Sequence, residues 1–421
     1  MKLAKGVLLS LALLAQACSV APMAEPSASS GEPSVPSPVA PATAPVEPFS
    51  SDAASASFDV TWERVAFPEW DAITTGMWGD GRWIVGGFVW CDLGWCPRIW
   101  TSNDGRSWTG AELPEQDGMS VKVTAFARDT HGYVGAALTC TANGVLKTST
   151  ALFWRSADGG RWEVIGSVKL GTIAEDCVGI DHLVATEAGL VGTTQLRKAS
   201  PSFVIESSEG VDWAPTSSES FGLPPETPLS EPDTIQVDPS SAIIAAGCRA
   251  CPVAVWRSGK GRAWTELGRL APEDSVHELS VAMGPRPVVA AFAINQELYG
   301  EQPVCDLACR TSVWALEDGS FRQVFNPDMP HRPRLAFTGD AYLLVGTSAV
   351  PRESVAYASV DGLEWTKVPT DPGVCRAGDL IAGPSQTLFL GTPFGYPSGP
   401  DESLPNEDAC GGMWLVDVSR A

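Results

Sequence analysis

The sequence predicts an all-β protein, a seven-bladed β-propeller whose blades each contain four antiparallel strands. Two observations predict this fold. A turn motif flanked by aromatic residues recurs from residue 58 onward and closes at positions 108, 162, 213, 264, 321 and 365. Apolar runs that end in glycine or alanine precede the copies of the motif. A repeat of about 50 residues that holds four short strands is typical of propeller blades.

The turn motif is expected between the third and fourth strands of a blade. Its clearest copies, at 100–108 and 154–162, read WTSNDGRSW and WRSADGGRW. Asp-Gly between two apolar runs is a strong hairpin signal, because both residues of a two-residue turn must accept positive φ. We therefore expect tight Asp-Gly hairpins at these positions.

The apolar runs are the expected second strands, and they set the number of blades. Their small residues suit strands that are crowded near the centre of a ring. Seven such runs occur along the chain, at 83–87, 133–135, 190–192, 243–246, 288–291, 343–346 and 388–391.

The seventh unit contains only three strands, because its third-strand aromatic is Trp414 and its turn would begin near Ala421. A strand at 59–66 can supply the fourth, with Trp62 in the place that Trp108 holds in the first blade. Pairing these segments removes two exposed sheet edges, which would otherwise invite association. We predict that 59–66 closes the last blade and that Trp62 packs beside Trp414.

The N-terminal residues 1–17 carry two lysines, a short apolar stretch and Ala-Gln-Ala directly before Cys18. This pattern is typical of a secretory signal, and the apolar stretch is too short to span a bilayer. The cysteine resembles that of the bacterial lipobox, which becomes the lipid-modified first residue of the mature protein. The resemblance implies an exported protein, lipid-anchored at Cys18 to the cell envelope (the outer membrane in a Gram-negative cell). Ordinary secretion with an incidental Cys18 is the alternative.

Residues 18–57 are rich in proline, alanine and serine and show no hydrophobic periodicity. Such a segment cannot bury enough apolar surface to offset the entropy of ordering it. At about 3.1 Å per residue in a polyproline conformation, it would span on the order of 120 Å. We expect a tether that holds the globular part, residues 58–421, clear of the membrane.

The charge of the chain excludes one class of partner. The 421 residues include 28 Lys and Arg against 50 Asp and Glu, which gives a net charge of −22. Because nucleic acids are bound through neutralisation of phosphate by Lys and Arg, this surface would repel them. No phosphate-binding loop or dinucleotide motif occurs in the sequence, so we expect no cofactor, and we expect a monomer.

Ten cysteines besides Cys18 form an even set, which predicts five disulfides in an exported chain. Each falls in or next to a loop between the second and third strands of a blade, or between consecutive blades. In a propeller these loops share the face opposite the Asp-Gly turns. The expected pairs are Cys91–Cys96, Cys140–Cys177, Cys248–Cys251, Cys305–Cys309 and Cys375–Cys410.

Two metal sites are the alternatives to a metal-free protein. Four thiolates for zinc are offered on adjacent blades by Cys248, Cys251, Cys305 and Cys309. Carboxylates for Ca²⁺ are offered, without the alternating spacing of a dedicated loop, by Asp401, Glu402, Glu407 and Asp408. The oxidising compartment favours disulfides over zinc, and we expect no bound metal.

The turn motif Ser-x-Asp-Gly-x-x-Trp resembles the Asp-box (BNR) repeat of sialidases and of several non-enzymatic propellers. The resemblance covers residues 58–421 as a repeating pattern, with one residue fewer between Ser and Trp than in the family. The copies that close at Trp264 and Phe321 lack parts of the motif. The resemblance implies that the motif is structural, on hairpins away from the ligand face, and it implies no catalytic residue.

Candidate ligand-binding residues fall in two groups on the cysteine-bearing face. Trp90 and Trp95 lie in a hairpin too short to bury both, and exposed Trp commonly marks glycan or protein contacts. Packing of both against a neighbouring loop is the alternative. Alignment of the inner strands brings further candidates together at the mouth of the channel: Glu278, Arg334 and Asp379 in one register, with Arg376 nearer the mouth and His331 as its counterpart. These charges either bind a ligand or neutralise one another around a wet channel.

These observations favour a non-catalytic scaffold, displayed from the envelope, that binds an envelope or extracellular protein or a glycan. A glycoside hydrolase of sialidase type is the alternative, because such a site needs an arginine cluster, a Tyr nucleophile and a Glu. The residue types are present at Arg332, Arg334, Arg376, Tyr396 and Glu402. Tyr396 and Glu402, however, lie in a loop rich in Pro and Gly, which is poorly suited to preorganise them.

Overall fold

The computed structural model describes only part of the chain. The described residues are 57–67, 72–91, 94–115, 120–143, 146–173, 177, 179–187, 189–194, 204–215, 234–238, 243–247, 252–258, 264–272, 274–294, 309–327, 329, 331–347, 354–371, 377–391 and 412–421. No helix occurs among them, and so none of them forms a long apolar helix that would cross a membrane. The predicted signal peptide, Cys18 and the predicted tether up to residue 56 lie outside these ranges.

The described strands pair into seven antiparallel sheets of four strands, which confirms the predicted all-β propeller. Blade 1 contains β2 (Ala72–Gly79), β3 (Arg82–Cys91), β4 (Gly94–Ser102) and β5 (Thr109–Gly110). Blade 2 contains β6 (Val121–Asp129), β7 (Gly132–Asn143), β8 (Leu146–Ser156) and β9 (Glu163–Ile173). Blade 3 contains β10 (His182–Thr186), β11 (Gly189–Thr193), β12 (Val204–Ser207) and β13 (Ala214–Pro215).

The second half of the ring repeats the same order. Blade 4 contains β14 (Thr234–Asp238), β15 (Ile243–Gly247), β16 (Val253–Ser258) and β17 (Trp264–Leu270). Blade 5 contains β18 (Ser275–Met283), β19 (Pro287–Ile294), β20 (Cys309–Glu317) and β21 (Ser320–Phe325). Blade 6 contains β22 (His331–Phe337), β23 (Tyr342–Thr347), β24 (Ser354–Ser359) and β25 (Thr366–Val368). Blade 7 contains β26 (Ala377–Ala382), β27 (Thr387–Gly391), β28 (Gly412–Arg420) and, as its outer strand, β1 (Phe58–Val65).

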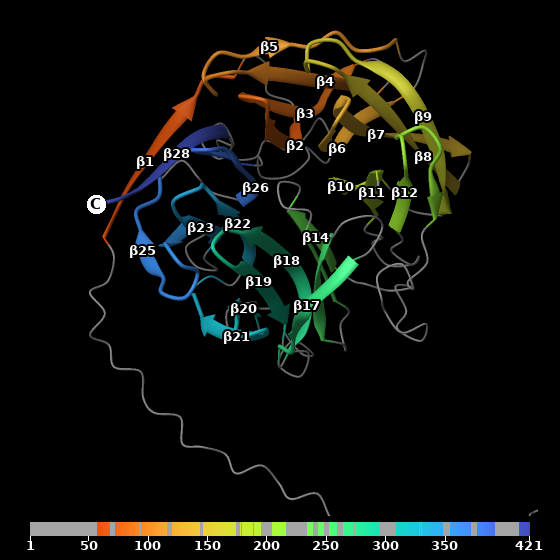
Figure 1. Ribbon diagram of the computed structural model, residues 1–421. Coiled ribbons are helices and arrows are strands. Elements are labelled where there is room, and N and C mark those ends of the chain that lie inside the picture. The colour runs from red at the N-terminus through yellow and green to blue at the C-terminus, as the bar shows by residue number, and fades with distance from the viewer. Residues whose placement is uncertain are drawn as a thin grey trace, which may run out of the picture. The chain divides into compact units, whose positions relative to one another are not determined.

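The seven sheets stand around a common centre, with the first strand of each blade innermost (Figure 1). These inner strands contact one another in the order β2, β6, β10, β14, β18, β22 and β26, and β26 contacts β2 in turn. The hydrophobic core lies between neighbouring blades. In one cluster, for example, Val85 and Trp100 of blade 1 pack with Leu388 and Met413 of blade 7. Apolar side chains packed between neighbouring blades therefore help to stabilise the ring.

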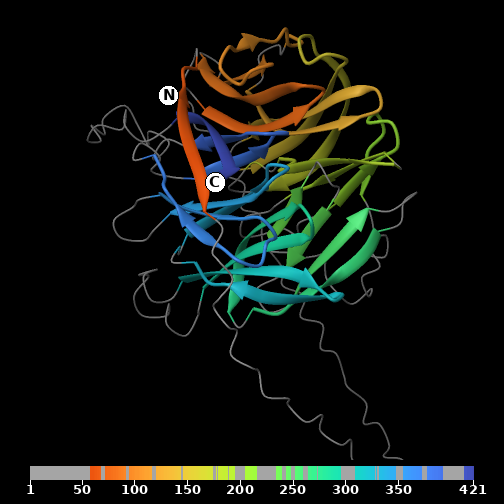
Figure 2. The same ribbon diagram turned by 60° about the vertical axis from the view of Figure 1, so that its left-hand side comes forward.

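Strand β1 closes the last blade, as predicted, and runs antiparallel to β28 along its whole length (Figure 2). The Trp62 ring contacts Phe389 with 5.7 Å between ring centroids, and Phe389 contacts Trp414 at the same distance. Phe389 thus stands between the two tryptophans that we expected to touch. The closing strand still shares one core cluster with Trp414.

Two further contacts fix β1 to the blades beside it. The indole N–H of Trp62 donates to the carbonyl oxygen of Pro369 in blade 6 at 2.9 Å. The Arg106 guanidinium in blade 1 donates to both oxygens of the Glu63 carboxylate, with Nε at 2.8 and 3.1 Å from them. The closing strand therefore connects blades 6, 7 and 1.

The Asp-Gly turns between third and fourth strands are stabilised by their own side chains. In blade 1, Ser102 Oγ accepts the N–H of Gly105, and Asp104 Oδ1 accepts the N–H of Arg106, both at 2.8 Å. Trp108 closes the turn by donating its indole N–H to the carbonyl oxygen of Gly105 at 3.0 Å. The same bonds recur in two other blades, at 156–162 and 359–365.

The capped turns at 102–108, 156–162 and 359–365 are wider than the tight hairpins that we expected, whereas the copy at Asp318–Gly319 is a tight hairpin, as predicted. Gly105 has a φ of 70°, but the non-glycine residues with positive φ among those described are Asp80 and Asp318, both at 48°. Asp104 is therefore outside the left-handed region, because its carboxylate caps the backbone and only the glycine needs positive φ. Asp80 and Asp318, each followed by a glycine of positive φ, form the tight turns between β2 and β3 and between β20 and β21.

Candidate functional site

The ring has two faces, which we name by the features that they carry. The turn face holds the Asp-Gly turn at 102–108 and its equivalents. The disulfide face lies at the opposite ends of the same strands and carries Cys91–Cys96 and Cys140–Cys177. Both pairs were predicted, and both are confirmed. The first closes the tip of the β3–β4 hairpin, and the second ties β7 to the segment that leads into β10.

Most of the other predicted cysteine positions lie outside the described residues, namely Cys248, Cys251, Cys305, Cys375 and Cys410. Cys309 is described and is disulfide-bonded, so it has no thiolate to offer to the alternative zinc site. Within the described ranges, no group of three or more His, Cys, Asp or Glu is placed to hold a metal ion. The candidate calcium carboxylates between 401 and 408 also fall outside those ranges.

Trp90 and Trp95 pair directly across the β3–β4 hairpin on the disulfide face. Their ring centroids are 6.2 Å apart. Side chains alternate along a strand, so Phe88 lies on the same side of the hairpin, and its ring contacts both indoles. Trp90 nevertheless keeps 55% of its surface exposed, whereas Trp95 is partly buried.

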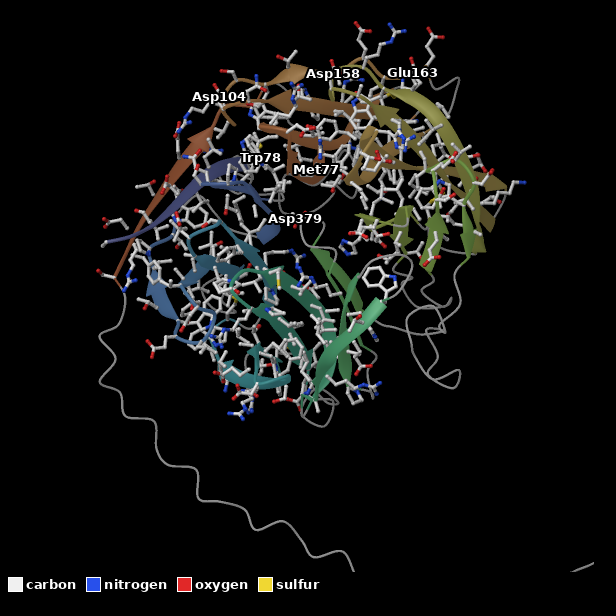
Figure 3. The ribbon with its side chains drawn as sticks, viewed as in Figure 1. Met77, Trp78, Asp104, Asp158, Glu163 and Asp379 are labelled. Carbon is white, nitrogen blue, oxygen red and sulfur yellow. A yellow bond between two sulfur atoms is a disulfide. The ribbon has the colours of Figure 1, made fainter. Side chains whose placement is uncertain are left out.

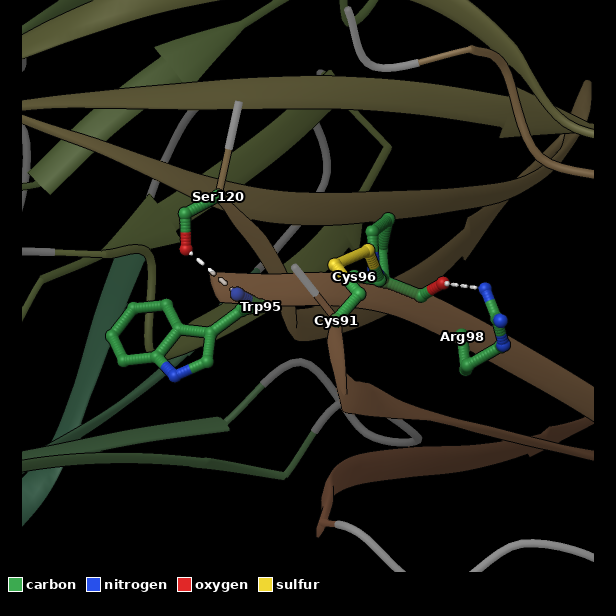
Figure 4. Close-up of a disulfide and its surroundings, with 6 residues drawn as sticks. Cys91, Trp95, Cys96, Arg98 and Ser120 are labelled. Atoms are coloured by element: carbon green, nitrogen blue, oxygen red, sulfur yellow. Dashed lines mark hydrogen bonds between the residues drawn. A yellow bond between two sulfur atoms is a disulfide. The ribbon is translucent and has the colours of Figure 1, made fainter. Parts of the chain in front are cut away.

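Trp95 is held by the segment that begins blade 2. Its backbone N–H donates to Ser120 Oγ at 2.9 Å (Figure 4). Lys122 Nζ lies over the Trp95 ring, 4.9 Å from the centroid, in a cation–π contact. Arg98 leaves the hairpin on the side away from Trp95 (Figure 4). The expectation of two exposed tryptophans therefore holds for Trp90, while Trp95 anchors the hairpin to blade 2.

The charged candidates lie on the inner strands, each next to a β-bulge. In β18, β22 and β26 the pairing with the second strand shifts directly before Glu278, Arg334 and Asp379. The same irregularity occurs in β2 and β6, before Thr75 and Ala125. The predicted common register of the three charged residues is thus confirmed. Figure 3 shows Asp379 on the inner side of the ring and Asp104 at its periphery.

Arg334 connects three neighbouring blades. Its Nε donates to the carbonyl oxygen of Gly378 in blade 7 at 2.6 Å, and its Nη1 donates to that of Pro333 at 3.0 Å. Nη1 also lies 3.7 Å from Glu278 Oε2 in blade 5. The Arg334 guanidinium therefore binds groups of the protein itself. This agrees with the interpretation that the charges neutralise one another around the channel. Arg376, the other arginine predicted here, lies outside the described residues.

Burial raises the pKa of the Asp379 carboxyl above its ordinary value. The Arg334 guanidinium and the N–H of Leu380, which donates to Asp379 Oδ1 at 2.9 Å, act in the opposite direction. The Asp379 side chain is only partly exposed. Loss of water around its carboxyl group therefore has a larger effect on the pKa than these two interactions. The cluster of Glu278, Arg334 and Asp379 thus joins blades 5, 6 and 7 and contains one carboxyl group that resists ionisation.

Sequence reasoning missed Ser120 and Lys122, which belong to the same site as Trp95. They follow Trp95 by about one half of a repeat, so no local motif links them to it. Lys122 alternates with the buried Val121 and Val123 on β6, but nothing in that alternation points to Trp95.

No family model matches this chain, and no curated protein matches it. Similar solved structures include a GH74 xyloglucanase from Xanthomonas campestris, at 14% sequence identity and a TM-score of 0.48. That match covers 79% of this chain and 52% of the xyloglucanase, so this chain spans about half of its length. The WD40 β-propeller domain of Doa1 is similar at 9% identity and a TM-score of 0.41, over 86% of this chain and 97% of the domain. Neither likeness assigns an activity to this chain.

Proposed function

We propose that this protein is a non-catalytic binding scaffold of the cell envelope that holds a glycan or protein ligand on its disulfide face. The observation that carries the proposal is Trp90, which is 55% exposed at the tip of a hairpin closed by Cys91–Cys96. Large aromatic residues dominate the binding energy of many recognition sites when they are presented on a rigid support. Here the support is the ring of blades.

The rigidity of the hairpin favours binding. Trp90 pairs with Trp95, and Trp95 is in turn held by Ser120 and Lys122 of blade 2. A side chain that is already ordered loses little conformational entropy when it meets a ligand. The contacts of Trp90 with Phe88 and Trp95 therefore support its exposed indole.

The path of the chain favours the disulfide face over the turn face. Strand β28 runs from the disulfide face at Gly412 to the turn face at Arg420, where Phe58 pairs with it. The backbone N–H of Ala421 donates to the carbonyl oxygen of Ser57 at 2.9 Å. The chain therefore enters the propeller at the turn face, and an anchor at Cys18 would leave the disulfide face turned away from the entry point.

The described phenols are buried and do not support the sialidase-type alternative; Tyr357 is one of them, and the other two bond to a neighbouring blade. Tyr133 is buried and donates its hydroxyl to the carbonyl oxygen of Gly79 at 2.7 Å. Tyr342 donates in the same way to the carbonyl oxygen of Arg286, and burial raises its pKa to about 12. Both phenols are thus used between blades and are poor nucleophiles. Tyr396 and Glu402, on which the alternative depends, lie outside the described residues.

The test of this proposal compares binding with turnover on the full chain. The purified protein is assayed with a fluorogenic sialoside and, in parallel, for retention of glycans and purified envelope proteins. We expect saturable binding without turnover, lost in Trp90→Ala and kept in Val164→Ala, which alters an exposed apolar residue on β9. Sialoside turnover, or no retention of any glycan or protein, would overturn the scaffold, and binding that is indifferent to Trp90→Ala would remove Trp90 from the binding site.

The envelope location has its own test. Cells that express the full chain are labelled with a palmitate analogue, and the label is expected on the wild type and absent from Cys18→Ala. A wild type that carries no label would refute lipidation and leave the binding proposal to be judged by the assay above.

A further inference from the structure

We infer that the ligand of the Trp90 hairpin is a neutral carbohydrate, with a sugar ring stacked on the exposed indole of Trp90. This inference rests on the proposed function and names the class of ligand for that same site. The residues that carry it are Trp90 and Trp95 on blade 1 and Ser120 and Lys122 at the start of blade 2.

Among the described residues, Trp90 is the one large apolar side chain exposed on the disulfide face, which favours a small ligand over a protein. The other large hydrophobic side chains exposed in the described part of the chain are Val164 and Val211. Val164 lies on the outer strand of blade 2, and Val211 lies in the turn that follows β12 in blade 3. The centre of a protein–protein interface needs several apolar side chains that become buried together. The described surface around Trp90 offers one.

An isolated and well-supported indole suits a sugar. A pyranose ring has a face of C–H groups that packs on an aromatic surface, while its hydroxyls remain in water or bind polar groups. Trp90 is braced by Phe88 and Trp95, with ring centroids 6.0 and 6.2 Å away. Ser120 Oγ accepts the backbone N–H of Trp95, and its own O–H can donate to a sugar hydroxyl.

The charge of the molecule favours a neutral sugar over an acidic one. A net charge of −22 repels anionic glycans at a distance. The nearest cation, Lys122, already has its Nζ placed over the Trp95 ring. Arg98 points away from Trp95 (Figure 4), and Arg334 is bonded to backbone carbonyls of blades 6 and 7. A sialylated or uronate-containing glycan would therefore meet no arginine cluster in the described part of this site.

The experiment screens the full chain against an array that pairs each neutral oligosaccharide with an acidic version of the same backbone. We expect retention of neutral members over their acidic partners, followed by a titration with the best neutral one. Trp90→Ala should weaken that binding by about 30-fold, the effect of removing a dominant aromatic contact. Trp90→Phe should restore part of the loss, and Val164→Ala should bind as the wild type does. The thermal unfolding of all three variants should match the wild type, since both sites are exposed.

Three results would overturn the inference: no neutral glycan retained, retention of acidic members alone, or neutral binding unchanged in Trp90→Ala. A purified protein ligand that is lost in Trp90→Ala would overturn the carbohydrate assignment and leave the proposed scaffold in place. Absence of both glycan and protein binding, or sialoside turnover, would remove the scaffold as well.

Discussion

The turn face and the disulfide face are made from the same strands, yet they are stabilised in different ways. On the turn face, equivalent bonds recur in different blades: Tyr133 and Tyr342 each donate a hydroxyl proton to the preceding blade. On the disulfide face, the contacts differ from blade to blade. Cys140–Cys177 joins blades 2 and 3, whereas Lys122 stacks on Trp95 between blades 1 and 2. Because the repeated bonds stabilise the turn face, the loops of the disulfide face can differ in sequence from blade to blade. Binding sites usually develop in such variable loops.

Removal of the Cys140–Cys177 disulfide should produce the largest change, because it closes the longer of the two described loops. The Cys140–Cys177 bond closes a sequence separation of 37 residues, and Cys91–Cys96 closes one of 5. Loop-closure entropy predicts that Cys140→Ala with Cys177→Ala lowers the free energy of unfolding by about 4 kcal/mol, and Cys91→Ala with Cys96→Ala by about 2 kcal/mol. Urea unfolding under non-reducing conditions measures both, and an equal loss would show that loop length does not govern stability here.

A single methyl group on the turn face should have the next largest effect. Gly132 has a φ of 121°, and a Cβ there would clash with the carbonyl oxygen of Ser156. We expect Gly132→Ala to lower the free energy of unfolding by about 3 kcal/mol, through backbone strain and displacement of β8. Gly160→Ala is the matched control, since its Cβ would stay 3.4 Å or more from its neighbours. Similar losses in the two variants would contradict a rigid turn face.

Neutralising Asp379 should stabilise the protein at pH 7 by less than either change above. Because its pKa is raised in the folded state, ionisation disfavours folding, and stability is gained as the pH falls through the folded-state pKa. Asp379→Asn should therefore raise the Tm at pH 7 and match the wild type below its ordinary pKa of 3.8. A lower Tm at pH 7 would mean that the attraction to Arg334 outweighs burial.

Neutralising Asp104 should have the smallest effect, and one of opposite sign. Hydrogen bonds from the backbone N–H groups of Ser107 and Arg106 hold the pKa of Asp104 well below its usual range. Its stabilising contribution is present above pH 3.8, the ordinary value, and is lost as the pH falls through the folded-state pKa. We expect Asp104→Asn to lower the Tm slightly at pH 7, with the difference shrinking below pH 3.8. A difference that grows in acid would refute this assignment.

The sequence predicted the features that depend on repetition and on strand edges. The count of blades followed from the apolar runs, and the closure by β1 followed from the missing fourth strand of blade 7. Cys91–Cys96 and Cys140–Cys177 followed from their places relative to the strands. Each of these depends on spacing along the chain, which the sequence states directly.

The remaining features depend on contacts that spacing does not reveal. The bulges of the inner strands insert two threonines, a histidine and a glycine, so no single residue type marks them: Thr74, Thr124, His277 and Gly378. The predicted tight hairpin is confirmed at Asp318–Gly319 and was wrong for the capped turns at 102–108, 156–162 and 359–365, because Asp-Gly can form either shape. Which one forms depends on whether a serine two positions before the aspartate binds the glycine N–H, as Ser102 does. The partners of Trp95 lie on the next blade. They were missed because spacing along the chain does not reveal contacts between blades.

The closing strand also determines how the ring would carry a mechanical load. Strand β1 begins at the turn face, where Phe58 pairs with Arg420, and ends at the disulfide face, where Val65 pairs with Met413. A pull on the chain ahead of Ser57, resisted by a ligand on the disulfide face, therefore acts along β1. Load in that direction is shared by all the hydrogen bonds between β1 and β28, together with the Glu63–Arg106 ion pair, instead of opening them one at a time. The pairing of the first strand with the last strand, which closes the ring, would therefore be the part of the protein that resists such tension.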